Sequence, residues 1–417
     1  MAPALPSALA RSLPLLALAL VACSPRNPTP DASADSASSD VDVVATDSSE
    51  PAMDAAVMDD VVPASEGGRY TFPDATPSVG DPLVLDPRTR GPFRTGYRVL
   101  SITYTPPTAS APRTIPVHVW YPTWALSGPI AVYQRLVMDR ESFRDAPPAP
   151  PVHMGGYPVH VYSHGDRGFG GSSAFVARYF ASHGWITVAP DHVGNTLSDT
   201  PSPRPYALYH LRSRDVSAAL DAVERLPMTD PLRQLGAIVT SRTVLSGHSF
   251  GTHTVWTSAG ATFDVERIRP NCTAANACND ADMMAFAMTN YHDARFVAGI
   301  PMAGSINRSL FGPMGHTSVT NFPMLAMSGT ADPVGADTQF DSTAPMPLTW
   351  IDIRGGCHQF FALGGCADIP DSEQDRIVST WALAFARRHV LDDRSTLVQS
   401  VIDGSMPVSD RVTLRMR

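Results

Sequence analysis

Positive charge is scarce in this sequence, and it is never concentrated. The 417 residues contain 31 Lys and Arg against 40 Asp and Glu, so the net charge is −9. No run of Lys or Arg is present, whereas proteins that bind nucleic acid need a clustered basic surface. We therefore expect no nucleic-acid partner.

The sequence also lacks a hydrophobic run long enough to span a membrane. Its N-terminal apolar segment, 12–22, is too short to cross a bilayer as a stable helix. This segment follows a single charge, Arg11, and runs into the tetrapeptide LVAC, which ends at Cys23. The tetrapeptide resembles the bacterial lipobox, in which the Cys is lipidated and becomes the new N-terminus. We expect a lipoprotein signal peptide over 1–22 and a lipid anchor on Cys23; the alternative is a plain signal peptide with a Cys near its cleavage site.

No aromatic residue occurs in the next segment, 23–66, which is rich in Ser, Asp, Ala and Pro. Such a segment cannot bury enough apolar surface to offset its chain entropy, so we predict a disordered acidic tether. An anchor followed by a tether indicates an exported bacterial protein held at a membrane. The outer membrane or cell surface is the expected location, with secretion as the alternative.

Cysteine is rare, with five residues in the chain. If Cys23 is lipidated, the other four fall into two close pairs, Cys272 with Cys278 and Cys357 with Cys366. An exported chain meets an oxidising environment, so each pair predicts a local disulfide. Metal binding is the rival interpretation. Neither pair has C-x-x-C spacing and no His lies at zinc-finger spacing, so we expect no metal.

The folded part is predicted to begin near residue 67 and to form one domain over 67–417, in which strand and helix patterns alternate from about residue 157. Two β-rich segments, 97–107 and 113–123, predict a hairpin, and 128–151 favours a short helix followed by a Pro-rich loop. An insertion is expected around 264–293. Further strands are expected at 157–165, 185–191, 241–247, 294–304, 322–329 and 348–356, and helices at 172–184, 208–226, 250–261 and 371–391.

This alternation predicts an α/β fold with a doubly wound, mostly parallel sheet and antiparallel N-terminal strands. In such sheets ligands bind beyond the carboxyl ends of the strands. Residues that follow the predicted strands are therefore the candidates for a functional site.

A pentad GHSFG, residues 247–251, stands between a predicted strand and a predicted helix. Gly-x-Ser-x-Gly arises often by chance, but this setting is the one in which the Ser becomes an exposed nucleophile. Ser249 is therefore the candidate nucleophile. We expect its neighbour His248 to point elsewhere and to serve packing.

A serine nucleophile needs a base and an orienting acid, which in this kind of fold follow in the order acid, then His. Asp332 lies just past one predicted strand and His358 just past the next, so the sequence supplies both in that order. We predict a triad of Ser249, Asp332 and His358. Asp337 and Asp341 are the substitute acids.

An oxyanion hole would complete the site. One expected donor is the backbone N–H of Phe250, directly after the nucleophile. The loop 162–171 contains His164 and Gly165, which resemble the HG-type motif and make the N–H of Asp166 the second donor.

The chain resembles α/β-hydrolases of the platelet-activating factor acetylhydrolase and dienelactone hydrolase group, near bacterial polyester hydrolases. The resemblance extends from about residue 94 to 390 and rests on PVHVWYP, VYSHG, SHGWITVAPDH, GHSFG, SGTADP and HQFF. One departure is Asp166, because such enzymes usually carry an apolar or aromatic residue there. A carboxylate beside a developing oxyanion is unfavourable unless it points away.

The resemblance implies the α/β-hydrolase fold and a serine carboxylic-ester hydrolase that works through an acyl-enzyme, without a cofactor. The expected substrates are small-molecule or polymeric esters with short or accessible acyl groups. Two alternatives stay open: a non-catalytic binding lipoprotein on the same scaffold, and a serine amidase or peptidase with the same triad.

Overall fold

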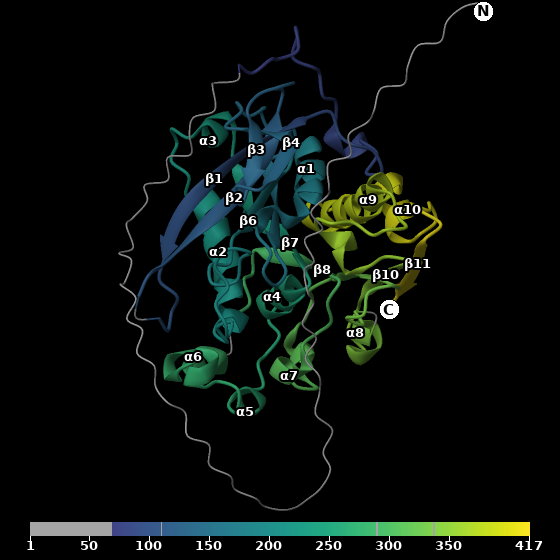
Figure 1. Ribbon diagram of the computed structural model, residues 1–417. Helices are drawn as coiled ribbons and strands as arrows, with labels where there is room; N and C mark the ends of the chain where they lie inside the picture. The colour runs from purple at the N-terminus through teal and green to yellow at the C-terminus, as the bar shows by residue number, and fades with distance from the viewer. Residues whose placement is uncertain (1–68, 110, 289–290, 337) are drawn as a thin grey trace, which may run out of the picture. The chain divides into compact units, whose positions relative to one another are not determined.

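A mixed sheet of eleven strands runs through the computed structural model, which describes residues 69–109, 111–288, 291–336 and 338–417 (Figure 1). The strand order is β11-β10-β9-β8-β7-β5-β6-β2-β1-β4-β3. The strands are β1 (Arg94–Tyr104), β2 (Arg113–Thr123), β3 (Ile130–Tyr133), β4 (Val137–Arg144), β5 (Tyr157–Ser163), β6 (Ile186–Pro190), β7 (Ile238–His248), β8 (Phe296–Met302), β9 (Leu325–Gly329), β10 (Thr349–Ile353) and β11 (Val412–Met416).

Strands β5 to β10 pair in parallel, and β1 with β2 and β2 with β6 pair antiparallel. The predicted α/β class, the mostly parallel sheet and the antiparallel N-terminal hairpin are therefore confirmed. The buried character of β5, in which all seven residues are buried, is typical of a parallel strand covered on both faces.

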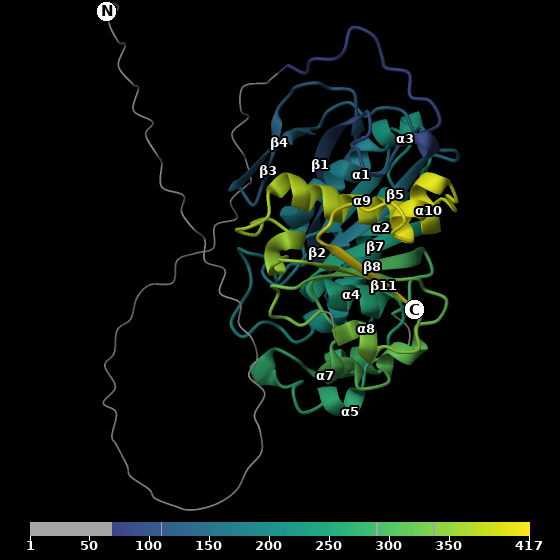
Figure 2. The same ribbon diagram turned by 90° about the vertical axis from the view of Figure 1, so that its right-hand side faces the viewer.

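Helices cover both faces of the sheet. The helices are α1 (Ala174–Ser182), α2 (Leu208–Glu224), α3 (Pro231–Leu235), α4 (Phe250–Ser258), α5 (Val265–Ile268), α6 (Asp280–Ala287), α7 (Arg308–Phe311), α8 (Thr338–Ser342), α9 (Asp371–Val390) and α10 (Thr396–Ile402). Helices α1 and α9 share one hydrophobic core with the sheet, and α2 and α4 share another (Figures 1 and 2). Helix α9 has acidic residues in its first turn and basic residues in its last, as its dipole favours.

The helix predicted within 128–151 was wrong, because residues 130–144 form the antiparallel hairpin of β3 and β4; the Pro-rich loop predicted after it is present. Its turn uses Gln134 and Arg135, with φ of 48° and 57°. Such turns favour Asn and Gly, so no local sequence signal marks this one. The hairpin is held by a buried contact, in which the Tyr133 hydroxyl donates to the Asp139 carboxylate at 2.6 Å.

Residues past α9 add two elements that the sequence did not predict. Helix α10 packs near α9, and β11 pairs antiparallel with β10 at the edge of the sheet.

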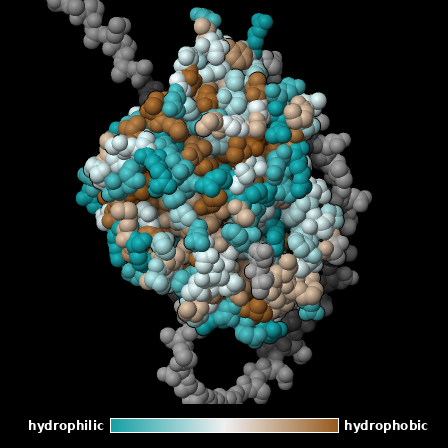
Figure 3. All heavy atoms as spheres, turned by 180° about the vertical axis from the view of Figure 1, so that it is seen from behind, coloured by the Kyte–Doolittle hydropathy of each residue, from teal (hydrophilic) through white to brown (hydrophobic). Residues whose placement is uncertain are grey.

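On the face seen from behind, hydrophobic residues form small areas among hydrophilic ones (Figure 3). Within the described ranges, no helix is long and apolar enough to span a membrane.

Candidate active site

Ser249 occupies a strained turn between β7 and α4. Its backbone has φ of 55° and ψ of −113°, which non-glycine residues rarely adopt. The Ser249 N–H donates to the Met302 carbonyl of β8 at 2.8 Å and so ties the turn to the neighbouring strand. The turn lies at the carboxyl end of β7, where parallel sheets of this kind bind ligands.

The two glycines of the pentad permit the close strand–helix crossing. A Cβ on Gly247 would lie 2.2 Å from the Gly251 carbonyl oxygen, and one on Gly251 would lie 2.0 Å from the Ser163 carbonyl oxygen. Both separations are far below contact distance and both involve backbone atoms. The sequence therefore needs glycine at both positions to form this turn.

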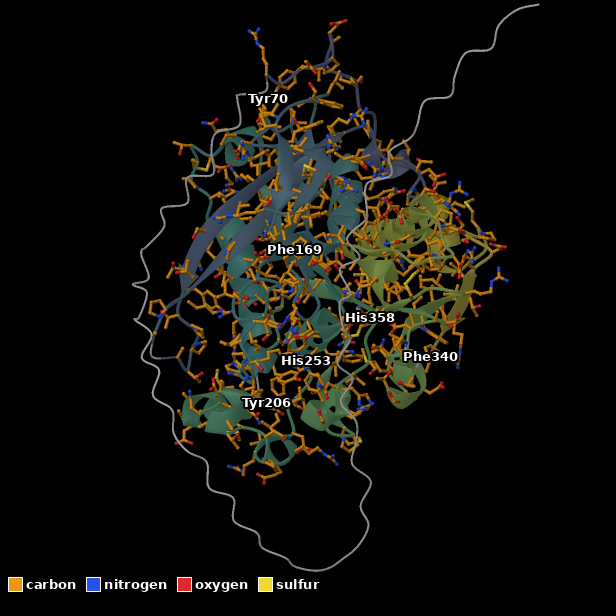
Figure 4. All side chains as sticks on the ribbon, viewed as in Figure 1. Tyr70, Phe169, Tyr206, His253, Phe340 and His358 are labelled. Carbon is orange, nitrogen blue, oxygen red and sulfur yellow. A yellow bond between two sulfur atoms is a disulfide. The ribbon has the colours of Figure 1, made fainter. Side chains whose placement is uncertain are left out.

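The structure brings the three predicted triad residues together. His358 Nε2 lies 2.9 Å from Ser249 Oγ, and His358 Nδ1 lies 3.1 Å from Asp332 Oδ2. Figure 4 marks His358 among the side chains. The Asp332 side chain is 1 % exposed and that of His358 is 23 % exposed. Because an ionised carboxylate only accepts, Nδ1 carries the proton in this arrangement and Nε2 is free to accept the Ser249 proton.

Asp341, one of the two substitute acids, does not join this arrangement. The Asp341 side chain is 78 % exposed and pairs with Arg415 at 3.3 Å. Asp337 lies outside the described residues. Asp332 is held in place by a further hydrogen bond, which the Val334 N–H donates to its Oδ1 at 3.0 Å.

A second Ser–His–Asp chain runs behind the site, and sequence analysis missed it. Ser163 Oγ lies 2.9 Å from His192 Nε2, and His192 Nδ1 lies 2.9 Å from Asp215 Oδ2. All three residues are fully buried, and Arg113 pairs with the same carboxylate at 2.8 Å. No substrate can reach this serine, whereas Ser249 is partly exposed. Only the Ser249 set is placed for chemistry.

Both predicted oxyanion donors lie beside the nucleophile. Phe250 begins α4, and the first N–H groups of a helix have no intrahelical acceptor. The loop after β5 passes so close that a Cβ on Gly165 would lie 3.2 Å from Ser249 Cβ. Asp166 is the next residue along the chain from this close approach.

The Asp166 carboxylate has two partners of its own. Asn195 Nδ2 donates to Oδ1 at 2.7 Å, and Arg204 forms a salt bridge to the same oxygen at 2.5 Å. Burial raises the pKa of Asp166, but the Arg204 charge and the hydrogen bonds outweigh this effect and leave the pKa below its ordinary value. The carboxylate is thus ionised and balanced by a cation, which removes much of its repulsion toward an oxyanion.

His248 does more than the packing expected of it. Its Nε2 lies 2.9 Å from the carbonyl oxygen of His358, and the two rings are 4.9 Å apart. Burial lowers the pKa of His248 to about 3, so the ring is neutral and Nε2–H donates to that carbonyl. The residue before the nucleophile therefore holds the backbone of the base, a contact between positions 110 apart that no local pattern reveals.

Aromatic contacts connect the insertion around 264–293 with the residues beside the nucleophile. Tyr206 lies 5.8 Å from Phe286 of α6, and Tyr209 lies 4.9 Å from Phe250, measured between ring centroids. Helices α5 and α6 flank the Cys272–Cys278 disulfide, which the structure contains as predicted. These rings form one wall beside the nucleophile.

The predicted Cys357–Cys366 disulfide is also present, and it closes the loop that begins at the candidate base. Such a short bridge stabilises a fold by about 2–3 kcal/mol. We expect Cys357→Ala with Cys366→Ala to lower the free energy of unfolding by about that amount. We also expect a kcat loss of up to about 10²-fold, because a base displaced by about 1 Å loses productive geometry.

The matched control is Cys272→Ala with Cys278→Ala. It removes a bridge of similar span away from the base, so it should reduce stability with little change in kcat. Unfolding by denaturant and ester hydrolysis at 25 °C measure the two quantities. Equal kcat in both double variants and the parent would show that the bridge does not position His358.

The predicted signal peptide, the tether and Cys23 lie outside the described residues. Among the residues described, no cluster of three or more His, Cys, Asp or Glu side chains could hold a metal ion. No known family model matches the sequence, and a search of curated proteins finds no match either.

Proposed function

We propose that the protein is a serine carboxylic-ester hydrolase with the α/β-hydrolase fold. The observation that carries the proposal is the hydrogen-bonded chain from Ser249 Oγ through His358 to Asp332. Its members follow β7, β9 and β10, at the carboxyl ends of parallel strands. The resemblance of the motifs to the acetylhydrolase and dienelactone hydrolase group supports the same conclusion.

The geometry supports a two-step reaction. His358 Nε2 accepts the Ser249 proton while Oγ attacks the ester carbonyl, and the developing oxyanion accepts hydrogen bonds from the N–H groups of Phe250 and Asp166. The protonated His358 then gives that proton to the departing alcohol, which leaves an acyl-enzyme. Water repeats the sequence and releases the acid.

The buried Asp332 carboxylate stabilises the imidazolium that forms in each step. It also fixes the ring so that Nε2 faces Ser249. The positive φ of Ser249 and the donor from β8 hold the hydroxyl in position before substrate arrives. Little reorganisation is then needed in the transition state.

Covalent labelling by a fluorophosphonate tests the proposal. The probe should attach to one residue, Ser249, and Ser249→Ala should abolish attachment. Ser163→Ala is the matched control, since Ser163 belongs to the buried chain and its loss should leave labelling intact. A wild-type protein that resists the probe would be a binding protein on this scaffold.

A second experiment compares the rates of hydrolysis of nitrophenyl esters of increasing chain length with those of nitroanilides. Faster cleavage of the esters indicates an esterase, and faster cleavage of the anilides indicates an amidase or peptidase.

We also propose that the protein is exported and anchored to a bacterial membrane by a lipid on Cys23. This proposal rests on the sequence of residues 1–66. Residues 23–66 would then hold the hydrolase away from the membrane surface and within reach of small or polymeric esters.

A further inference from the structure

Two arginines lie against the ring of Phe250, the residue that follows the nucleophile. The Arg212 guanidinium carbon is 4.3 Å from the ring centroid, and that of Arg204 is 4.6 Å from it. Guanidinium groups are attracted to aromatic faces at these separations. The side chain of one proposed oxyanion donor is thus held by two cations.

The other proposed donor is tied to the same arginines. Arg204 pairs with the Asp166 carboxylate, and Asn195 donates to it. The Asn195 side-chain oxygen in turn accepts from Arg212 Nη1 at 2.5 Å. Arg212 Nη2 also donates to the carbonyl of His164, two residues before Asp166. One guanidinium therefore connects the loop of Asp166 with the ring of Phe250.

Arg212 differs from Arg387, the other buried arginine among the residues that the structure describes. Arg387 pairs with Asp393 at 2.6 Å, whereas the contacts of the fully buried Arg212 guanidinium are a carbonyl, an amide, hydroxyls and an aromatic ring. Burial lowers the pKa of Arg212 to about 9, which still leaves it charged at neutral pH. The negative charges of Asp215 and Asp166 oppose this lowering of the Arg212 pKa, although neither carboxylate forms a hydrogen bond or salt bridge with the guanidinium. A buried cation without a carboxylate in contact is costly, and an oxyanion that develops nearby would offset part of that cost.

We propose that Arg212 is a positioning residue of the oxyanion hole, which fixes the loop of Asp166 against Phe250 and supplies positive charge behind the two donors. The proposal rests on the proposed esterase function. The guanidinium of Arg212 fits this role better than a lysine ammonium would, because its planar set of N–H groups binds two acceptors while its face stacks on a ring.

The test compares an ester with its thionoester, in which sulfur replaces the carbonyl oxygen. Sulfur is larger and accepts hydrogen bonds poorly, so a well-formed oxyanion hole strongly favours oxygen. We expect Arg212→Met to lower kcat by about 10²-fold with KM changed less than about threefold, because oxyanion stabilisation acts in the transition state. The ester-to-thionoester ratio of kcat/KM should fall at least about tenfold for the same reason. Arg212→Lys keeps the charge and should fall between Arg212→Met and the wild type in both quantities.

Two further variants serve as a stability control and as a second test of the same role. Arg387→Met removes another buried arginine, near the end of α9, and should lower thermal stability without changing the ratio. Arg204→Gln, at a side chain 29 % exposed, should fold even if Arg212→Met does not, and should lower the ratio through Asp166 and Phe250.

The outcomes separate the two proposals. An unchanged ratio in Arg204→Gln and in every Arg212 variant that folds would overturn the role of Arg212, even if kcat fell. Fluorophosphonate labelling at Ser249 would leave the esterase proposal standing in that case. A wild-type protein that neither labels nor cleaves any ester would overturn both.

Discussion

Ser249→Ala and His358→Ala should each lower kcat by about 10⁶-fold, and Asp332→Asn by about 10⁴-fold. The serine supplies the nucleophile and the histidine moves its proton, so either loss stops the covalent route. The Asn variant preserves shape but favours the wrong ring tautomer of His358. The double and triple variants should be no slower than Ser249→Ala, because the three residues act as one unit.

Asp341→Asn is the matched control for the acid, since its exposed carboxylate pairs with Arg415 and should be dispensable for hydrolysis. Single-turnover kinetics with a nitrophenyl ester measure each loss. Near-normal activity in Asp332→Asn would show that another carboxylate orients His358, and Asp337 would be the next residue to replace.

The position of the site could be predicted because each of its parts follows a strand. Hydrophobic runs such as those ending before Ser249 and Asp332 are local signals, and parallel strands bring their carboxyl ends to one edge. The order Ser, Asp, His along the chain then sufficed to choose the residues that the structure places within hydrogen-bond distance.

The supports of the site could not be predicted in the same way. His248 contacts a carbonyl 110 positions away, and Arg212 contacts a carbonyl 48 positions away. Neither residue belongs to a pattern, and each is defined by the packing of elements that are distant in sequence. The β3–β4 hairpin was missed for a different reason, because its turn residues, Gln134 and Arg135, are unusual at positive φ.

Buried neutral histidines dominate the expected response of this fold to acid. Burial lowers the pKa of His160 and His253 to about 3, and of His183 and His192 to about 4. Burial likewise lowers the pKa of His248 to about 3, and it holds the pKa of His164 well below its ordinary value. Each ring makes a hydrogen bond as a neutral group, as in the 2.7 Å contact of His160 with Ser246.

We therefore expect the protein to unfold at a midpoint between about pH 4 and pH 6. The unfolded chain binds protons at these rings below about pH 6.5, while the native state stays neutral until its lower pKa values are reached. The stabilisation is thus complete above pH 6.5 and is lost as the pH falls toward 3–4. One pKa unit corresponds to about 1.4 kcal/mol, so several such rings together can exceed a total stability of about 5–15 kcal/mol.

His160→Gln tests this account through proton uptake. Denaturant unfolding at a series of pH values gives the number of protons bound on unfolding from the slope of free energy against pH. At pH 5 this number should fall by about one in His160→Gln, and the acid midpoint should move lower, because one titrating ring is gone. His292→Gln, at an exposed position, should change neither quantity. A free energy of unfolding that is flat between pH 7 and pH 5 would mean that the histidines are protonated in the native state, and their neutral hydrogen bonds would have to be reassigned.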